Sequence, residues 1–129
     1  MKANRKIGLA VLLGVLIGAA GSAVIHARQA SPLPGYVFAE VEVTDPAMFQ
    51  KYAAQVEPTL APFGGHYIVR RGKLFALEGD VPKLFTVIAF DSAQKAQDWY
   101  NSPAYAAIKG LRISATKSRL FIGEGLPAK

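Results

Sequence analysis

The chain has 129 residues, which is enough for one domain and an appendage but not for two full domains. Its formal net charge of +6 misleads, because four of its 15 Lys and Arg residues precede residue 30, where there is no acidic residue, and the other 11 are set against 9 acidic residues for a balance of +2. This balance excludes a broad basic surface for nucleic acid, and the absence of cysteine excludes disulfides, thiol catalysis and cysteine-based metal sites.

Residues 1–28 are predicted to be a signal peptide or a membrane anchor. Lys2, Arg5 and Lys6 precede an uncharged run from Ile7 to Ile25. A basic start, an apolar middle and small residues near the end are typical of a cleaved signal peptide. The run is longer than the ~7–15 residues of most signal cores, however, and at about 1.5 Å per residue it nearly spans a ~30 Å hydrocarbon core, as an anchor would. Both interpretations stay open.

The two interpretations agree on which side of the membrane the rest of the chain lies. Basic residues beside an apolar segment hold their end in the cytoplasm, so everything after Arg28 is expected outside it. We therefore expect a periplasmic domain, which is either anchored in the inner membrane through residues 7–25 or secreted after signal cleavage.

Residues 29–35 are predicted to be a linker stiffened by two prolines, and a strand follows it. From Tyr36 to Val43 the sequence alternates with the period of two that is typical of a strand. One face of this strand carries Val37, Ala39, Val41 and Val43, and the other carries Tyr36, Phe38, Glu40 and Glu42.

A helix is predicted next, with Asp45 as its N-cap and Pro46 at its first position. Its apolar stripe has helical spacing and consists of Phe49, Tyr52, Ala53, Val56, Leu60 and Phe63. We expect a kink or a restart at Pro58 and the end of the helix at Gly64-Gly65, because glycine best tolerates a positive φ.

Three strands are predicted for the middle of the domain. His66–Arg71 and Lys73–Glu78 flank Gly72, residues 79–82 form a turn, and Leu84–Phe90 is an apolar strand.

The C-terminal part is predicted to contain two helical segments and a closing strand. Asp91-Ser92 caps the first segment, Ser102-Pro103 starts the second, and Arg119–Ile122 is the strand. The order is β-α-β-β-α-β with one extra strand in the middle, an α+β domain with a ferredoxin-like layout over residues 36–125, followed by a tail at residues 126–129.

Helices on one face of such a sheet would leave its other face without cover. That face would carry Tyr36 and Phe38, and further candidates for it are Phe85, Val87 and Phe121. Exposed aromatic side chains on an open sheet mark an association surface, so we expect a homodimer that closes two sheets together.

Short motifs occur through this domain in a fixed order. They are Gly35-Tyr36-Val37, Thr44-Asp45-Pro46, Tyr52, Phe63-Gly64-Gly65, Val69-Arg70, Leu77-Glu78-Gly79, Phe90-Asp91-Ser92, Ala96, Trp99-Tyr100, Ser102-Pro103 with Tyr105, and Arg112. With this order and spacing, residues 35–125 resemble an uncharacterised bacterial family, numbered 1330 among the domains of unknown function and grouped with the dimeric α/β barrels. The resemblance implies the fold and dimerisation, and it implies no particular reaction.

Three positions depart from the family pattern. The basic residue that usually follows the double glycine is His66 here, and two acidic residues of the family are replaced by Ala89 and Ala104. If a site of the family depends on those carboxylates, this chain binds something different or nothing.

Four polar residues are expected to converge on one face of the sheet. Because strands have a period of two, His66 and Arg70 should share a face, where Glu78 and Glu40 could meet them. A histidine beside a carboxylate can act as a general base, which makes His66 and Glu78 candidate catalytic residues. The alternative is a cross-strand ion pair between Arg70 and Glu78, with His66 at a partly exposed strand start.

The remaining candidate ligand-binding residues belong to the helices. The guanidinium of Arg112 could hold an anionic ligand, since it fits a carboxylate bidentately, or it could simply be a cation favoured at a helix C-terminus. Trp99, Tyr100 and Tyr105 are expected to form pocket wall or core.

No metal and no cofactor are expected, because His26 and His66 lack the spacing of metal ligands and no phosphate-binding or dinucleotide-binding motif occurs. The leading hypothesis is an exported or membrane-tethered homodimer that binds a small organic molecule in a cavity. A cofactor-independent enzyme of monooxygenase or isomerase type and a purely structural homodimer are the alternatives, so whether the chain is an enzyme stays open.

Overall fold

The structure, a computed structural model, describes residues 30–129. The predictions for residues 1–28, whether signal peptide or anchor, lie outside the described residues. Within the described part of the chain, no helix is both long enough and apolar enough to cross a membrane.

Four strands form one antiparallel sheet in the order β2-β3-β1-β4. The strands are β1 (Gly35–Val43), β2 (His66–Arg70), β3 (Leu84–Phe90) and β4 (Thr116–Glu124). The helices are α1 (Pro46–Leu60), α2 (Ala93–Tyr100) and α3 (Pro103–Ala115), with a 3-10 turn η1 (Ala61–Phe63) after α1. This is a mixed α and β fold with the β-α-β-β-α-β element order that the sequence predicted, without the predicted extra strand.

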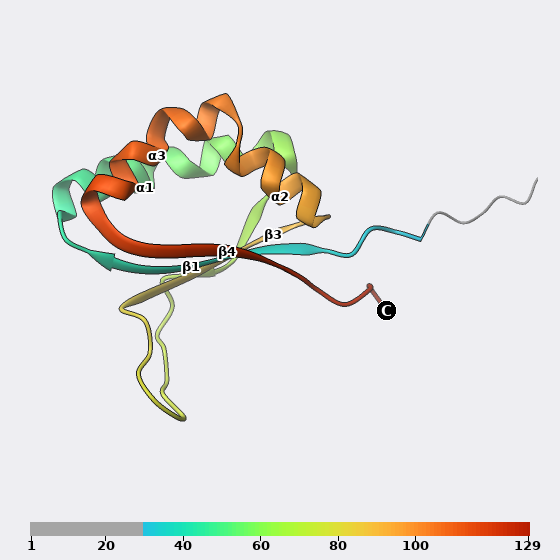
Figure 1. Ribbon diagram of the computed structural model, residues 1–129, viewed down its shortest axis with the longest axis horizontal. Coiled ribbons are helices and arrows are strands. Elements are labelled where there is room, and N and C mark those ends of the chain that lie inside the picture. The colour runs from blue at the N-terminus through green and yellow to red at the C-terminus, as the bar shows by residue number, and fades with distance from the viewer. Residues whose placement is uncertain (1–29) are drawn as a thin grey trace, which may run out of the picture.

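The helices of residues 30–129 all lie on one face of the sheet, which we call the covered face (Figure 1). The alternation of β1 turns Val37, Ala39 and Val41 to this face, where they are buried. The opposite, open face carries residues that lie across from one another in the strand register, and these are Tyr36, Phe38, Glu40, Phe85, Val87, Arg119 and Phe121. The predicted division of β1 into two faces is therefore confirmed.

The core between helices and sheet is unusually aromatic. Its largest fully buried side chains are Leu60, Phe90, Trp99 and Tyr105. The rings of Trp99 and Tyr105 lie 4.2 Å apart, centroid to centroid, and those of Trp99 and Phe90 lie 5.7 Å apart. Large rings add contact energy beyond their buried area, but two of these also carry polar groups that need partners inside the protein.

The predicted helix starts are confirmed by their caps. The side chains of Asp45, Ser92 and Ser102 each accept a hydrogen bond from the backbone N–H three residues further on, at 3.1, 3.1 and 3.2 Å. Helix α1 continues past Pro58 to Leu60 and then tightens into η1. Gly64 ends this turn with the predicted positive φ, 68°.

The predicted strand Lys73–Glu78 is wrong, and so is the extra strand in the element order. Residues 71–83 form a loop between β2 and β3, and it projects from the sheet on the side away from the helices (Figure 1). The β2–β3 ladder already ends at Arg70, so the apolar run Leu74–Leu77 beyond it has no neighbouring strand to pair with. Phe75 and Leu77 in this loop are 74% and 96% exposed.

Strand β4 is longer than the predicted Arg119–Ile122. Its first residues pair with the end of β1, from Thr116 opposite Val43 onward, so the ladder begins directly after α3. Polar residues at 117–119 hid this start from the hydrophobic pattern.

The first motif glycine marks a close approach between β1 and α2. A Cβ atom at Gly35 would lie 2.5 Å from the backbone nitrogen and Cα of Ala93. These are backbone atoms that cannot move aside, so only glycine fits where β1 passes the start of α2. At Gly110, in α3, a Cβ atom would meet nothing within 4 Å.

Two glycine-to-alanine substitutions should therefore change stability in opposite directions. Gly35→Ala should lower the free energy of unfolding by roughly 1–3 kcal/mol because the chain must shift. Gly110→Ala, the matched control, should raise it by roughly 0.5–1 kcal/mol because it removes a flexible residue from a helix. Denaturant unfolding of the full-length protein measures both, and equal effects of the two changes would contradict the close approach.

Candidate functional site

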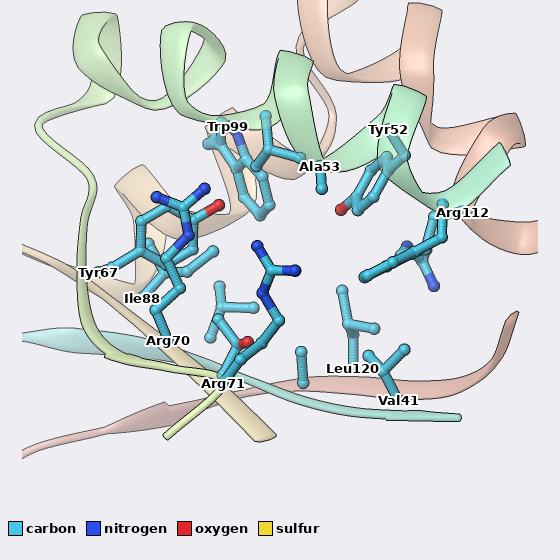
Figure 2. A pocket seen from close by; sticks show the side chains of 15 residues that line it. Val41, Tyr52, Ala53, Tyr67, Arg70, Arg71, Ile88, Trp99, Arg112 and Leu120 are labelled. Atoms are coloured by element: carbon cyan, nitrogen blue, oxygen red, sulfur yellow. The ribbon is translucent and has the colours of Figure 1, made fainter. Parts of the chain in front are cut away.

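A cavity of about 60 Å³ lies between α1 and the covered face of the sheet (Figure 2). Its floor consists of sheet residues, which are Val37, Ala39, Val41, Thr86, Ile88 and Leu120. Helix residues form the other side, and these are Phe49, Tyr52, Ala53, Val56, Trp99 and Arg112. Tyr67, Arg70 and Arg71 complete the wall at the end of β2.

The chemistry of the wall is aromatic and cationic. Of the 15 residues that line the cavity, three are arginines, and none of these described residues is His, Asp or Glu. Across residues 30–129, moreover, no three His, Asp or Glu side chains gather in a way that could hold a metal ion. The cavity therefore offers apolar contact, hydroxyl groups and positive charge.

A chain of hydrogen bonds runs through the wall from α1 to β4. The hydroxyl groups of Tyr52 and Tyr105 lie 2.8 Å apart. The Nε of Arg112 donates to the Tyr105 hydroxyl at 3.2 Å, and its Nη1 donates to Ser118 Oγ. Since Tyr105 accepts from Arg112, it can give its own proton to Tyr52, which leaves the Tyr52 O–H able to donate to a group in the cavity.

Burial keeps the tyrosines of this wall protonated. Burial raises the pKa of Tyr52 far above its ordinary value, and the neighbouring Tyr105 hydroxyl raises it further. Burial also raises the pKa of Tyr67, against the opposing effect of the Arg70 charge. Both phenols are therefore neutral hydrogen-bond donors at physiological pH.

Trp99 is held in place by a second, shorter set of hydrogen bonds. Its indole Nε1 donates to Thr59 Oγ1 at 2.9 Å, and that hydroxyl donates to the Val56 carbonyl at 2.6 Å. The ring is buried against Tyr105 and faces the cavity with its apolar surface.

The guanidinium of Arg112 is buried without a carboxylate partner. The side chain belongs to a residue that is 6% exposed, and no acidic residue within the described part of the chain forms an ion pair with it. An unpaired buried charge costs several kcal/mol. The C-terminus of α3 offsets only part of this cost, because a helix end contributes about 0.3–1 kcal/mol to a surface cation and about 2 kcal/mol to a partly buried one.

Two further arginines stand at the mouth of the cavity. A register shift between Tyr67 and Val69 turns Arg70 to the covered face, where it pairs with Glu57 of α1 at 3.0 Å. The next residue, Arg71, has a left-handed φ of 52°, which costs about 1 kcal/mol or more in a residue with a Cβ. Figure 2 shows its side chain extending toward the space between Trp99 and Tyr52.

The four polar residues that we expected to converge do not meet. The β2 register shift separates His66, which lies opposite Ala89 on the open face, from Arg70 on the covered face. Glu40 pairs with Arg119 on the open face at 2.7 Å. Glu78 lies exposed in the 71–83 loop.

Neither predicted arrangement of Glu78 is therefore correct. It forms no pair with His66 that could serve as a general base, and the expected Arg70–Glu78 ion pair is replaced by Arg70–Glu57. The physical cause is the same in both cases, because residues 71–83 do not return to the sheet.

The helix candidates are placed differently from one another. Trp99 and Arg112 line the cavity, and Tyr105 lies directly behind the wall. Tyr100 faces a separate hollow beside β4, with the Lys109 ammonium 4.6 Å from its ring centre. The roles of these residues in binding stay predictions.

Of the 15 residues that line the cavity, only Arg70, Trp99 and Arg112 were predicted from the sequence as site residues. Among those that were not are Tyr52, Tyr67 and Arg71. Tyr52 was recognisable as part of the apolar stripe of α1 and as one of the motif residues, but not as a site residue. A hydroxyl group at the centre of such a stripe is a signal in itself, since a buried phenol needs a hydrogen-bond partner. Nothing local in the sequence indicates the left-handed conformation of Arg71.

Comparisons with known proteins agree on the fold. The sequence model of a family described as a domain of unknown function, DUF1330, matches residues 34–126. The structure is similar to RPA0582, a protein of unknown function from Rhodopseudomonas palustris, with a TM-score of 0.60 and 17% identity over 73% of this chain and 83% of that one. It is also similar to SnoaB, a cofactor-independent oxygenase from Streptomyces nogalater, with a TM-score of 0.52 and 14% identity over 74% of this chain and 96% of that one. No curated protein matches by sequence.

Proposed function

Since the chain belongs to the family described as a domain of unknown function, DUF1330, we propose its activity from its own residues: it binds a small organic molecule in the cavity between α1 and the sheet. The observation that carries this proposal is the composition of the wall. Apolar and aromatic side chains surround a small number of oriented polar groups, among them the hydroxyl of Tyr52 and the guanidinium of Arg112. This combination is typical of ligand sites.

Binding without chemistry is favoured over an enzymatic role. SnoaB has the same fold and is a cofactor-independent oxygenase. A reaction that begins with proton removal requires a base within hydrogen-bond reach of the substrate. The cavity wall described here has no His, Asp or Glu, and its phenols stay protonated, so the monooxygenase or isomerase alternative lacks the general base that His66 and Glu78 were expected to supply.

Cavity occupancy can be tested with Trp99, which is the one tryptophan of the chain and lies in the cavity wall. Benzoate, benzamide and phenol serve as probes for the full-length protein. We expect at least one of them to change the Trp99 fluorescence in a saturable way, because the rings of the wall can pack against it.

Two neighbouring alanines of α1 provide the variant and its control. Ala53→Phe places a ring in the cavity and should abolish the response, whereas Ala54→Phe adds the same ring at an exposed position and should leave it intact. An absence of saturable binding by all three probes, or equal binding by the Ala53→Phe protein, would contradict the proposal.

A second copy of the chain is proposed to cover the open face. Phe38 stacks on Phe121 and on Phe85 at centroid distances of 5.3 and 6.4 Å, and in this aromatic row Phe121 is 46% exposed while Phe38 and Phe85 are half-buried. The loop with exposed Phe75 and Leu77 projects on the same side of the sheet (Figure 1). A two-fold pairing of sheets would bury both features at once, as an isologous interface does.

A charge in the aromatic row should therefore separate the two copies. Phe38→Asp should weaken self-association at least about 100-fold, because an obligate interface on the order of 2,000 Å² or more tolerates no unpaired charge at its centre. Ile113→Asp is the control, since Ile113 is a 58% exposed apolar residue of α3 on the helix side. Sedimentation of the full-length protein in detergent measures the self-association of the wild type and of both variants. A monomeric wild type at high micromolar concentration would refute the dimer.

Residues 7–25 are proposed to engage the inner membrane and to place the domain in the periplasm. The support is the basic N-terminal flank followed by the uncharged run. Protease added to spheroplasts should digest the domain, and the mass of the mature chain shows whether a signal peptide has been removed. Recovery of the undigested full-length chain from the cytoplasmic fraction would disprove this location.

A further inference from the structure

The positive charge of the cavity points to the class of ligand, and this inference rests on the proposed function. Arg112 has five N–H donors. Two of its hydrogen bonds are made within the described residues, to the hydroxyl groups of Tyr105 and Ser118. No fully buried side-chain nitrogen of the described residues lacks a partner, so Arg112 Nη2, which makes no hydrogen bond within these residues, is accessible. Arg112 is one of the residues that line the cavity.

The acidic residues nearby are engaged elsewhere. Glu57 pairs with Arg70, and Glu40 pairs with Arg119 on the other side of the sheet. For Arg71, as for Arg112, no ion pair forms within residues 30–129. Two guanidinium groups therefore face one small space without a carboxylate from the protein.

We infer that the ligand supplies that carboxylate: the cavity binds a small organic acid, whose carboxylate accepts hydrogen bonds from Arg112 deep in the cavity. A planar guanidinium binds a carboxylate with two parallel N–H···O bonds, and this geometry selects carboxylates over compact anions. The O–H of Tyr52 is placed beside Arg112 as a further donor.

The size of the cavity limits the rest of the ligand. A single water molecule needs roughly 10–15 Å³ of such space, so about 60 Å³ accommodates a carboxylate and a few carbon atoms. The remainder of a longer ligand must extend out of the cavity through its mouth, where Arg71 lies exposed. Arg71, whose backbone is left-handed, places a second cation at this side of the cavity, with its Cζ 6.0 Å from the centre of the Phe49 ring.

The experiment compares acids with their neutral amides in the full-length protein. Acetate, butyrate and benzoate are titrated beside acetamide, butyramide and benzamide at about pH 7, where the acids are ionised. Trp99 fluorescence and calorimetry report binding. We expect at least one acid to bind at least about tenfold more tightly than its amide, because its hydrogen bonds are charge-assisted.

Variants show which arginine is responsible for the preference for acids over amides. Arg112→Gln should remove the preference for acids, whereas Lys95→Gln, which deletes an exposed charge of α2 beside Asp91, should retain it. Arg71→Gln should weaken binding of the acids severalfold and leave that of the amides unchanged. If Arg112→Gln does not fold, the acid-to-amide comparison in the wild type and in Arg71→Gln still decides, since Arg71 is exposed and outside the core.

The outcomes separate this inference from the proposed function. Amides that bind as tightly as acids would overturn the inference while the cavity remains a binding site. An acid preference that persists in Arg112→Gln would also overturn it, because the charge would then lie elsewhere. If neither class binds, the proposed function fails together with the inference.

Discussion

The row of side-chain hydrogen bonds from Tyr52 through Tyr105 to Arg112 constrains how the helices and the sheet of this domain pack together. It connects α1 to α3, and through Ser118 it connects α3 to β4. An apolar interior would be expected to close by packing, as protein cores do. Here polar groups also link the helices, and they must keep their partners, because an unsatisfied buried hydroxyl or guanidinium costs free energy. The cavity lies where these hydrogen-bonded side chains meet the aromatic rings of the core.

The two faces of the sheet consequently have different roles. The covered face combines the core with a cationic, aromatic cavity, and the open face presents aromatic rings and one exposed ion pair between Glu40 and Arg119. β1 serves both faces through its alternation, so a single strand positions cavity floor and association surface. The ligand site and the proposed dimer interface are thereby separated by the thickness of the sheet.

The features that could be predicted from the sequence are those fixed by neighbouring residues. Asp45, Ser92 and Ser102 were recognisable as caps because capping needs only a side-chain oxygen and a backbone N–H three residues away. The faces of β1 could be assigned from alternation alone. Arg112 was recognisable as a candidate anion ligand, although nothing in the sequence indicated that it would be buried without an acidic partner.

The features that could not be predicted depend on pairing between distant segments. The register shift in β2 is defined only against β3, and it moved Arg70 away from His66. The largely apolar residues Lys73–Glu78, bounded by turn residues, resembled a strand but have no strand beside them. One wrong strand and one shifted register were enough to disperse the expected His66, Arg70, Glu78 and Glu40 cluster, while the true wall formed around Tyr52.

The most direct test of this account observes the Arg112 guanidinium itself. In full-length protein labelled with ¹⁵N-arginine, the Nε–H resonance of Arg112 is assigned by its loss in Arg112→Lys. Because its Nε donates to buried Tyr105, this resonance should be protected from exchange in the unliganded protein. The account predicts that it shifts saturably as benzoate is added, and that benzamide needs at least about tenfold higher concentrations to shift it. An Arg112 resonance that does not move while Trp99 reports benzoate binding would contradict it.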